Sequence, residues 1–377
     1  MERPATTQRD EQELRHLLAL TLIPGIGARR VRTLVRHFKN AQSVFKRSPA
    51  ELMRVPDIGT QITKVILSFD QWPQVDIILK KTRQIDASIL TIYDESYPER
   101  LRQLYDAPVL LWYKGNTSLL DTNAISVVGT RRPSVYGKRV TEKFTADLVH
   151  HGLTIISGLA YGVDTVAHSS CLKAGGKTIA VLGSGIDWIY PSSNKVLARN
   201  IIDHSGVIIS EYPPGTKPDA SNFPERNRIV SGLSLGTLVI ETGEKGGSMI
   251  TARLALDQNR EVFVVPHPLD NLQGVGCNAL IKKGTGKLVQ DIEDLLVEFP
   301  ALQFDESEPI RAEPKWQDLA LSEQSKAICK LLEDGQLHID TICERLGKSS
   351  QEVMGDLLEL EMQDCIQQTA GKYFHLK

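Results

Sequence analysis

From residue 124 onward, short apolar runs alternate with amphipathic segments, and this alternation constrains the fold more than any other feature. The apolar runs predict strands at 124–128, 153–156, 178–182, 207–210, 238–240, 262–265 and 288–289. The segments between them predict helices at 140–150, 164–174, 193–203, 229–235 and 249–257. Strands that are apolar throughout are buried on both faces. We therefore expect an α/β fold with a Rossmann-like, extended parallel-sheet core.

Glycines follow several of these strands, at Gly129, Gly158, Gly183 and Gly243. In open parallel sheets, ligands bind outside the carboxyl ends of the strands. The sequence therefore places a binding site where these glycines lie.

The segment after the 238–240 strand combines glycines with a lysine and a helix start, in Lys245, Gly246, Gly247 and Ser248. Glycines let backbone N–H groups face a ligand, and a helix N-terminus adds partial positive charge. The order of residues differs from a nucleotide-triphosphate P-loop, where the lysine follows the glycines. A free nucleotide and a nucleic-acid backbone both fit such a loop, and a plain tight turn is the structural alternative.

Three further segments bring basic, polar or aromatic residues to neighbouring strand ends, and one of them, 222–228, is expected to be a short loop. Arginine offers forked donors for phosphate oxygens, and an aromatic ring beside it can stack a base. The alternative is that Arg226 and Arg228 form internal ion pairs and that Phe223 is part of the core. The candidate ligand contacts are Gly129, Arg131, Arg132, Ser157, Gly158, Lys195, Phe223, Arg226, Asn227, Arg228, Lys245, Gly246, Gly247 and Ser248.

Two arrangements resemble catalytic sites. Asp164 and His168 lie one helical turn apart without a third metal ligand, and Asp164 is the expected N-cap of its helix. Glu241 ends a strand beside the glycine loop, with no nucleophile next to it. We expect no catalytic residue, no metal and no cofactor.

Two flanking regions surround the predicted sheet. Residues 1–82 contain two turns of the form apolar-Pro-x-Ile-Gly between helices, at 23–27 and 55–59, which resemble a helix-hairpin-helix or SAM-like domain. Residues 83–299 form the Rossmann-like domain, and its first segments, 88–93 and 109–113, are expected to add edge strands. The Pro- and Glu-rich segment 300–315 is the expected linker. The order of elements in 316–377 predicts a winged helix.

Charge and cysteine content limit the partners and the compartment. The net charge of −2 is unevenly spread, because residues 1–48 carry +6 and residues 301–377 carry −7. The five scattered cysteines favour a reducing cytoplasm over a disulfide framework. The polar start of the chain is not typical of a secretory signal, and no apolar run is long enough to span a bilayer.

The motifs VVGTRRPSVYG, SGLAYGVDTVAH, YPSSN, FPERNR, EKGGSMITARLALDQNREVFVVP and GCNALIKKG resemble, in order and spacing, the bacterial DNA processing protein A (DprA/Smf) family. The resemblance implies a homodimer without enzymatic turnover that binds single-stranded DNA. It also implies that the protein protects incoming DNA and loads the RecA recombinase during natural transformation, with single-strand-binding protein as a further partner.

The resemblance carries over to individual positions. Arg131 matches the arginine of the family's G-[ST]-R motif, and the F-P-x-R-N-R motif supplies Phe223, Arg226, Asn227 and Arg228. Two positions depart from the family: Gly246 stands where serine is more frequent, and His267 stands where glycine is usual. The first should loosen the glycine loop, and the second puts the following turn in doubt.

Two other functions remain as alternatives. Related Rossmann-like enzymes hydrolyse nucleoside monophosphates, but their P-G-G-x-G-T-x-x-E motif is matched only from Gly236 to Glu241, without the Pro-Gly-Gly. A winged helix could bind duplex DNA in a transcription factor. Here residues 316–377 hold six basic and eleven acidic residues, and an acidic recognition helix repels phosphates. We therefore hypothesise that this domain contacts protein, or regulates the DNA site, and does not bind duplex DNA.

Overall fold

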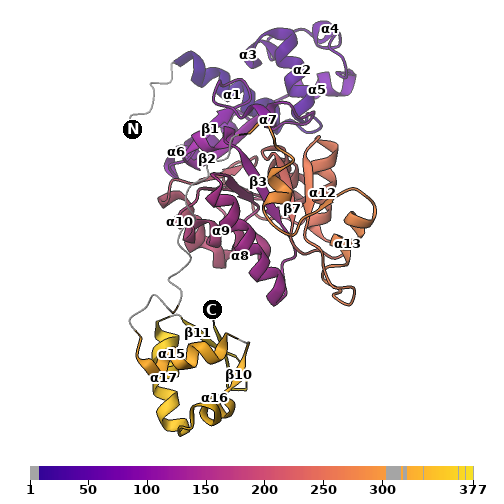
Figure 1. The fold of residues 1–377 in the computed structure, drawn as a ribbon. Coiled ribbons are helices and arrows are strands. Elements are labelled where there is room, and N and C mark those ends of the chain that lie inside the picture. The colour runs from indigo at the N-terminus through magenta and orange to yellow at the C-terminus, as the bar shows by residue number, and fades with distance from the viewer. Residues whose placement is uncertain are drawn as a thin grey trace. The chain divides into compact units, whose positions relative to one another are not determined.

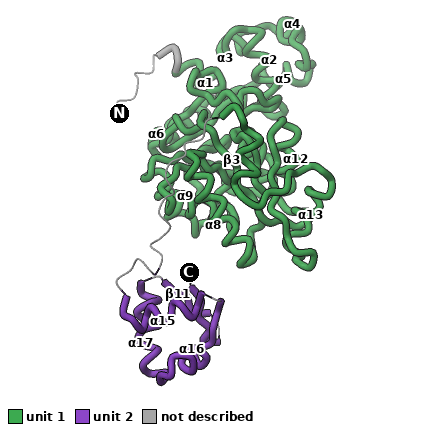
Figure 2. Tube along the Cα trace, viewed as in Figure 1, with its two compact units in different colours: residues 1–307 green, residues 308–377 purple. Residues whose placement is uncertain are grey.

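The computed structural model describes residues 8–302, 316, 321–333, 335–363, 365–369 and 371–376. The chain divides into two compact units, residues 1–307 and 308–377 (Figure 2). The predicted linker lies largely outside the described residues. None of the described helices is both long enough and apolar enough to cross a bilayer.

A nine-stranded sheet forms the centre of the first unit (Figure 1). Its order is β1-β2-β6-β5-β4-β3-β7-β8-β9; the seven strands from β6 to β9 are parallel, whereas β1 and β2 pair antiparallel at one edge. The predicted parallel core and the predicted edge strands are both confirmed. The strands are β1 (Ser88–Thr91), β2 (Leu110–Gly115), β3 (Ala124–Val128), β4 (Thr154–Ser157), β5 (Thr178–Leu182), β6 (Val207–Ser210), β7 (Gly236–Val239), β8 (Glu261–Val264) and β9 (Lys287–Leu288).

Helices cover both faces of the sheet because alternate strand side chains point to opposite sides. In β3, Ile125 and Val127 pack with α8 and α9, whereas Ala124 and Val128 belong to the core that includes α11 and α12. The helices of this region are α7 (Glu99–Arg102), α8 (Val135–His150), α9 (Val163–Lys173), α10 (Lys195–Asp203), α11 (Asn222–Gly232), α12 (Gly247–Asp257), α13 (Val275–Lys282) and α14 (Glu293–Leu296), with short 3-10 turns at Thr117–Asp121 and Ser192–Asn194.

Six helices precede the sheet and pack against its antiparallel edge within the same unit. Trp112 of β2 donates from Nε1 to Thr82 Oγ1 at 3.0 Å, and Lys81 pairs with Asp187 at 2.7 Å. The two predicted hairpins contact each other, since Arg30 donates to the carbonyl oxygens of Gly25 and Asp57. The helices are α1 (Gln8–Leu22), α2 (Ala28–Phe38), α3 (Ala41–Val44), α4 (Pro49–Leu52), α5 (Thr60–Leu67) and α6 (Trp72–Gln84).

Two local predictions were wrong. Residues 222–228 were expected to form a loop but are the first turns of α11, because Pro224 lies in the first turn of the helix, where proline is tolerated. Asp164 was expected to cap α9, but the N-cap is Gly162 and Asp164 lies within the first turn. Both differences change which side chains face the strand ends.

The second unit has the predicted winged-helix order. Its sheet has the order β10-β12-β11, and its core includes Ile328, Ile342, Val353, Leu357 and Phe374. The elements are α15 (Glu323–Leu332), β10 (Leu337–His338), α16 (Ile339–Leu346), α17 (Ser350–Met362), β11 (Ile366–Thr369) and β12 (Tyr373–Leu376).

The surface of α17 is apolar as well as acidic. Met354, Leu358 and Met362 recur every fourth residue, so they lie on one side of the helix, and all three are exposed. Glu359 is also exposed. The charge pattern of this helix alone did not predict its apolar side.

Candidate nucleic-acid interface

A cavity of about 620 Å³ opens at the carboxyl ends of β3, β4 and β7. The chain runs from β3 outward through β4, β5 and β6, and then returns to place β7 on the other side of β3. Strand order therefore reverses between β3 and β7, and such a switch point leaves a crevice where open α/β sheets bind ligands. The fold thus places a cavity where the strand-end glycines predict a binding site.

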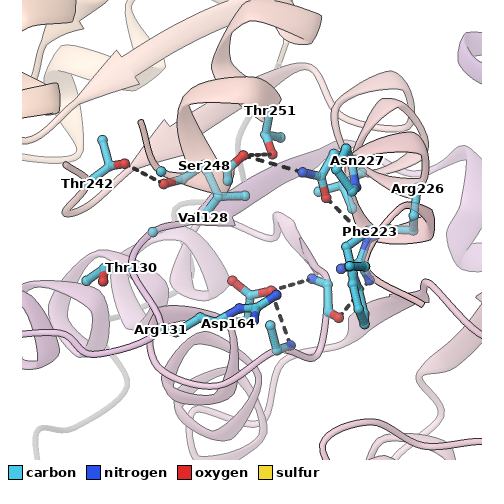
Figure 3. A pocket seen from close by; sticks show the side chains of 18 of the residues that line it. Val128, Thr130, Arg131, Asp164, Phe223, Arg226, Asn227, Thr242, Ser248 and Thr251 are labelled. Atoms are coloured by element: carbon cyan, nitrogen blue, oxygen red, sulfur yellow. Dashed lines mark hydrogen bonds between the residues drawn. The ribbon is translucent and has the colours of Figure 1, made fainter. Parts of the chain in front are cut away.

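Side chains from several segments face this cavity (Figure 3). Thr130 and Arg131 come from the loop after β3, whereas Ser248 and Thr251 come from α12. The third wall is α11. Of the predicted contacts, the structure brings together Gly129, Arg131, Gly158, Phe223, Arg226, Asn227, Gly246, Gly247 and Ser248.

Phe223 and Tyr190 are aromatic side chains that line the cavity. Arg131 Cζ lies 5.6 Å from the centroid of the Phe223 ring, and the Tyr190 ring lies 5.5 Å away. A Cβ atom on Gly183 would lie 2.8 Å from Phe223 Cδ1, so the glycine after β5 makes room for this ring. Arg131 itself is exposed. A guanidinium beside a partly exposed ring can hold a phosphate while the ring stacks a base.

Arg226 lies beneath the cavity rather than at its surface, since it is only 4% exposed. Its Nη1 donates to the carbonyl oxygens of Gly158, at 2.7 Å, and Val181. Burial lowers the pKa of the guanidinium to about 10, against the attraction of Asp164, which raises it. Arg226 therefore stays charged at neutral pH and ties α11 to the ends of β4 and β5.

Asp164 supplies the opposite charge. Its Oδ2 accepts the backbone N–H groups of Gly158 at 3.1 Å and Ala160 at 3.3 Å. Burial raises the pKa of this carboxyl, whereas Arg226 and the two amides lower it. The residue pattern alone does not place Asp164 in the cavity, because a carboxylate near a helix start is also typical of an N-cap.

The glycine loop contributes its backbone. The N-cap of α12 is Gly246, whose residue type offers no capping side chain, so the first N–H groups of the helix lack a side-chain cap. Ser248 is buried, and its hydroxyl donates to Thr242 Oγ1 at 2.7 Å. A Cβ atom on Gly246 would lie 2.6 Å from that same Thr242 oxygen. The Thr242 hydroxyl therefore occupies space that a serine at position 246 would need.

Five predicted contacts do not line the cavity. Ser157 is buried and donates to the carbonyl oxygen of Val127 at 2.7 Å. Arg228 pairs with Glu211 at 2.6 Å and with Asp106 at 3.1 Å, as the internal ion-pair alternative expects. The other three are exposed residues next to the cavity walls or at the start of α10, namely Arg132, Lys195 and Lys245.

Several lining residues were missed by the sequence analysis. A tyrosine, a Pro-Asp-Ala segment and three threonines face the cavity because of tertiary packing, and their residue types alone carry no ligand signal. The only local hint was the position of Tyr190 next to Pro191. The missed residues include Thr130, Tyr190, Pro218, Asp219, Ala220, Thr242 and Thr251.

Asp164 and His168, the pair that resembled a metal site, each bind different structural partners. His168 Nδ1 lies 2.7 Å from Thr178 Oγ1, which itself donates to the Ile155 carbonyl oxygen. Burial, followed by repulsion from Arg226, lowers the pKa of His168 to about 3, so the ring is neutral. Among the described residues, no group of three His, Cys, Asp or Glu side chains is placed to hold a metal.

Glu241 is buried and occupied by hydrogen bonds. Its carboxylate accepts from Ser134 N at 2.7 Å, Ser134 Oγ at 2.8 Å and Asn271 Nδ2 at 3.2 Å. Asn271 Nδ2 also lies 3.0 Å from His267 Nδ1, and His267 Nε2 donates to the Ile240 carbonyl oxygen at 2.7 Å. His267 therefore ties its turn to the end of β7, which resolves the doubt raised by the missing glycine.

Comparison with known proteins agrees with this geometry. The family model for DNA recombination-mediator protein A matches residues 88–300. The chain belongs to the DprA/Smf family. The models for a DprA winged helix domain and for a helix-hairpin-helix motif match residues 312–372 and 15–78.

Relatives in this family align over most of the chain. Protein Smf of Escherichia coli is 39% identical over 289 residues, which cover 75% of this chain and 76% of that protein. The crystal structure of DprA from Streptococcus pneumoniae is 34% identical and covers 78% of this chain and 98% of its own, with a TM-score of 0.65. DprA from Helicobacter pylori, described with a single-stranded DNA binding mode, is 34% identical, covers 56% of this chain and 94% of its own, and has a TM-score of 0.51.

Proposed function

We propose that this protein binds single-stranded DNA in the cavity between β3 and β7. The observation that carries the proposal is the convergence of Arg131, Phe223 and the uncapped N-terminus of α12 on one cavity. The guanidinium and the α12 amides would hold phosphates, and the ring would stack a base. Asn227, which donates to the Gly247 carbonyl oxygen at 3.4 Å, would keep α11 and α12 in register around the strand.

We further propose that the bound strand is incoming DNA, which the protein protects and onto which it loads RecA during natural transformation. The family match supports a recombination mediator. We propose a cytoplasmic homodimer, with RecA and single-strand-binding protein as partners. We propose that the chain consists of a helical domain (1–82), a Rossmann-like domain (83–299), a linker (300–315) and a winged helix (316–377).

We propose that the protein acts without enzymatic turnover. A nucleoside-monophosphate hydrolase would need a free carboxylate as general base. Glu241, the candidate from the sequence, does not line the cavity, and both of its oxygens accept hydrogen bonds from Ser134 or Asn271. The carboxylates that do line the cavity are also engaged, Asp164 by the N–H groups of Gly158 and Ala160 and Asp219 by Ser221. A polyanionic strand therefore suits this cavity better than a nucleotide substrate.

The test compares binding of oligo-dT and of a matched duplex across salt concentrations. Arg131→Ala should weaken oligo-dT binding and reduce the salt slope by about 0.7 for one lost phosphate contact. Arg132→Ala is the matched control, since Arg132 is the next residue, equally exposed, and does not line the cavity. Equal affinity of wild type and Arg131→Ala for oligo-dT would refute the site. Release of free base from nucleoside monophosphates would instead support the hydrolase.

A further inference from the structure

A second cavity, of about 750 Å³, lies between α1, α2 and the segment that follows β1. It opens at the carboxyl-terminal half of α2 rather than at the hairpins. Arg29 and Arg30, next to the first hairpin, are bound to Asp57 and to backbone carbonyl oxygens of the hairpins. The basic groups that remain available on α2 therefore face the cavity instead.

Two cations of this cavity are available to a ligand. Arg36 and Lys39 are exposed, and neither has a hydrogen-bond or ion-pair partner within the described part of the chain. Lys39 also has a φ of 74°, a left-handed conformation that favours glycine over a side chain. Arg32 uses its Nη1 for the carbonyl oxygens of Leu104 and Tyr105 and keeps its charge beside the other two.

The two carboxylates that line the cavity are engaged by the backbone. Glu13 accepts the N–H groups of Ala41 at 2.5 Å and Gln42 at 3.2 Å, and Asp94 accepts that of Thr91 at 2.7 Å. Arg102 adds a further positive charge to the lining. Cations therefore outnumber carboxylates, and the ligand that fits is an anion.

One exposed aromatic ring lines the cavity, and a second belongs to the segment that Arg32 binds. Tyr93 lines the cavity and is 48% exposed, and burial of its hydroxyl, opposed by Arg32, raises its pKa to about 12. Tyr105 is 69% exposed, and Arg29 Cζ lies 5.0 Å from its ring centroid. Positive charge interleaved with exposed rings is typical of surfaces that track a single strand and stack its bases.

The loop that carries Tyr105 also leads to the first cavity. Its next residue, Asp106, pairs with Arg228 of α11 at 3.1 Å, and α11 carries Phe223 and Asn227 in its first turns. The segment 104–106 thus connects Arg32, which lines the second cavity, with α11, which lines the first. We propose that the cavity beside α2 is a second contact for the same DNA strand, in which Arg36 and Lys39 bind phosphates and Tyr93 stacks a base. This inference rests on the proposed single-strand binding in the first cavity.

The experiment measures binding by the full chain to oligo-dT of about 4 to 16 nucleotides, the usual range for one binding module, and of about twice that length. The double variant Arg36→Ala/Lys39→Ala should bind the short strand as wild type does. It should bind the long strand more weakly, with a salt slope lowered by about 1.4 for two lost contacts. Tyr93→Leu should weaken long-strand binding about tenfold, and Tyr93→Phe should not.

The control is Arg54→Ala/Lys64→Ala, which removes two exposed cations from the same helical domain outside the cavity. Wild-type binding of the long strand by Arg36→Ala/Lys39→Ala, or an equal loss from the control pair, would overturn the second contact. An equal loss of affinity for the short and the long strand in Arg36→Ala/Lys39→Ala would also overturn it. Arg131→Ala distinguishes the two proposals. If Arg131→Ala weakens binding of both the short and the long strand, whereas Arg36→Ala/Lys39→Ala weakens binding of neither, only the second contact is refuted.

Discussion

Arg226 donates a hydrogen bond from Nη1 to the carbonyl oxygen of Gly158 at 2.7 Å, across 68 residues of sequence. The N–H group of the same glycine donates to Asp164 Oδ2 at 3.1 Å. A Cβ atom on Gly158 would lie 2.5 Å from Arg226 Nη2 and 2.8 Å from Asp164 Oδ2, so only glycine fits between the two charges. The end of β4 is therefore fixed from both sides, and the floor of the first cavity is rigid.

Loss of the Arg226 guanidinium should destabilise the fold. In Arg226→Leu, two buried carbonyl oxygens lose their donor and Asp164 loses its opposite charge. The free energy of unfolding should fall on the order of 3 kcal/mol, measured by urea denaturation. Adding Asp164→Asn should restore part of this loss by removing the uncompensated charge. A wild-type urea midpoint for Arg226→Leu would contradict the structural role of this side chain.

Burial of His168 should make stability depend on pH. Its pKa is lowered from 6.5 to about 3 in the folded state, so between these values the unfolded chain binds a proton that the folded chain does not. Stability should therefore fall as the pH drops below 6.5, by up to about 1.4 kcal/mol per pH unit. His168→Gln should lower that slope between pH 7 and 5 in urea titrations, whereas the exposed His204→Gln should keep it. An unchanged slope in His168→Gln would exclude the buried ring as its source.

The two glycines at the start of α12 should respond differently to alanine. Gly246→Ala would place a Cβ atom 2.6 Å from the buried Thr242 hydroxyl, whereas a Cβ atom on Gly247 meets nothing within 4 Å. Overpacking typically costs about 1–3 kcal/mol, so Gly246→Ala should lower the melting temperature and Gly247→Ala should not. If Thr242 causes the clash, Gly246→Ala/Thr242→Ser should be no better than Gly246→Ala, because the hydroxyl remains. Equal melting temperatures for the two single variants would refute this packing.

Removal of the winged helix should leave duplex affinity unchanged. The exposed side of α17 carries Met354, Leu358, Met362 and Glu359 and no basic residue, so it has no group that would release counterions from DNA. The measurement compares the full chain with residues 1–307, a compact unit, on duplex DNA and oligo-dT at physiological salt. A clear loss of duplex binding on truncation would show that this domain binds DNA after all.

Periodicity and turn residues were sufficient to predict the core of the fold. The strands 124–128, 178–182 and 207–210 have the predicted bounds, because a run of apolar residues between glycines or polar turns has few other solutions in a globular protein. The helix starts were less accurate. Residues 222–228, expected to be a loop, begin α11, and Pro224 lies in its first turn, where proline does not break the helix.

Spacing alone could not separate surface arginines from buried ones. Arg131, Arg226 and Arg228 belong to motifs of the same kind, yet Arg131 is exposed at the cavity, Arg226 binds carbonyl oxygens below it, and Arg228 forms ion pairs. Local sequence determines the backbone conformation that carries each side chain. The groups that accept its hydrogen bonds or pair with its charge come from segments tens of residues away.

The sequence by itself determined the parallel α/β core, the glycines at the strand ends and the family to which the chain belongs, because each of these depends on local residue patterns. Only the tertiary structure decided which charges remain available to a ligand. Arg36 and Lys39 have no partner among the described residues, whereas Arg29 and Arg30 are paired, because of how the hairpins and α1 pack around α2. Whether a charged side chain has a partner depends on the packed structure, because that partner can come from any part of the chain.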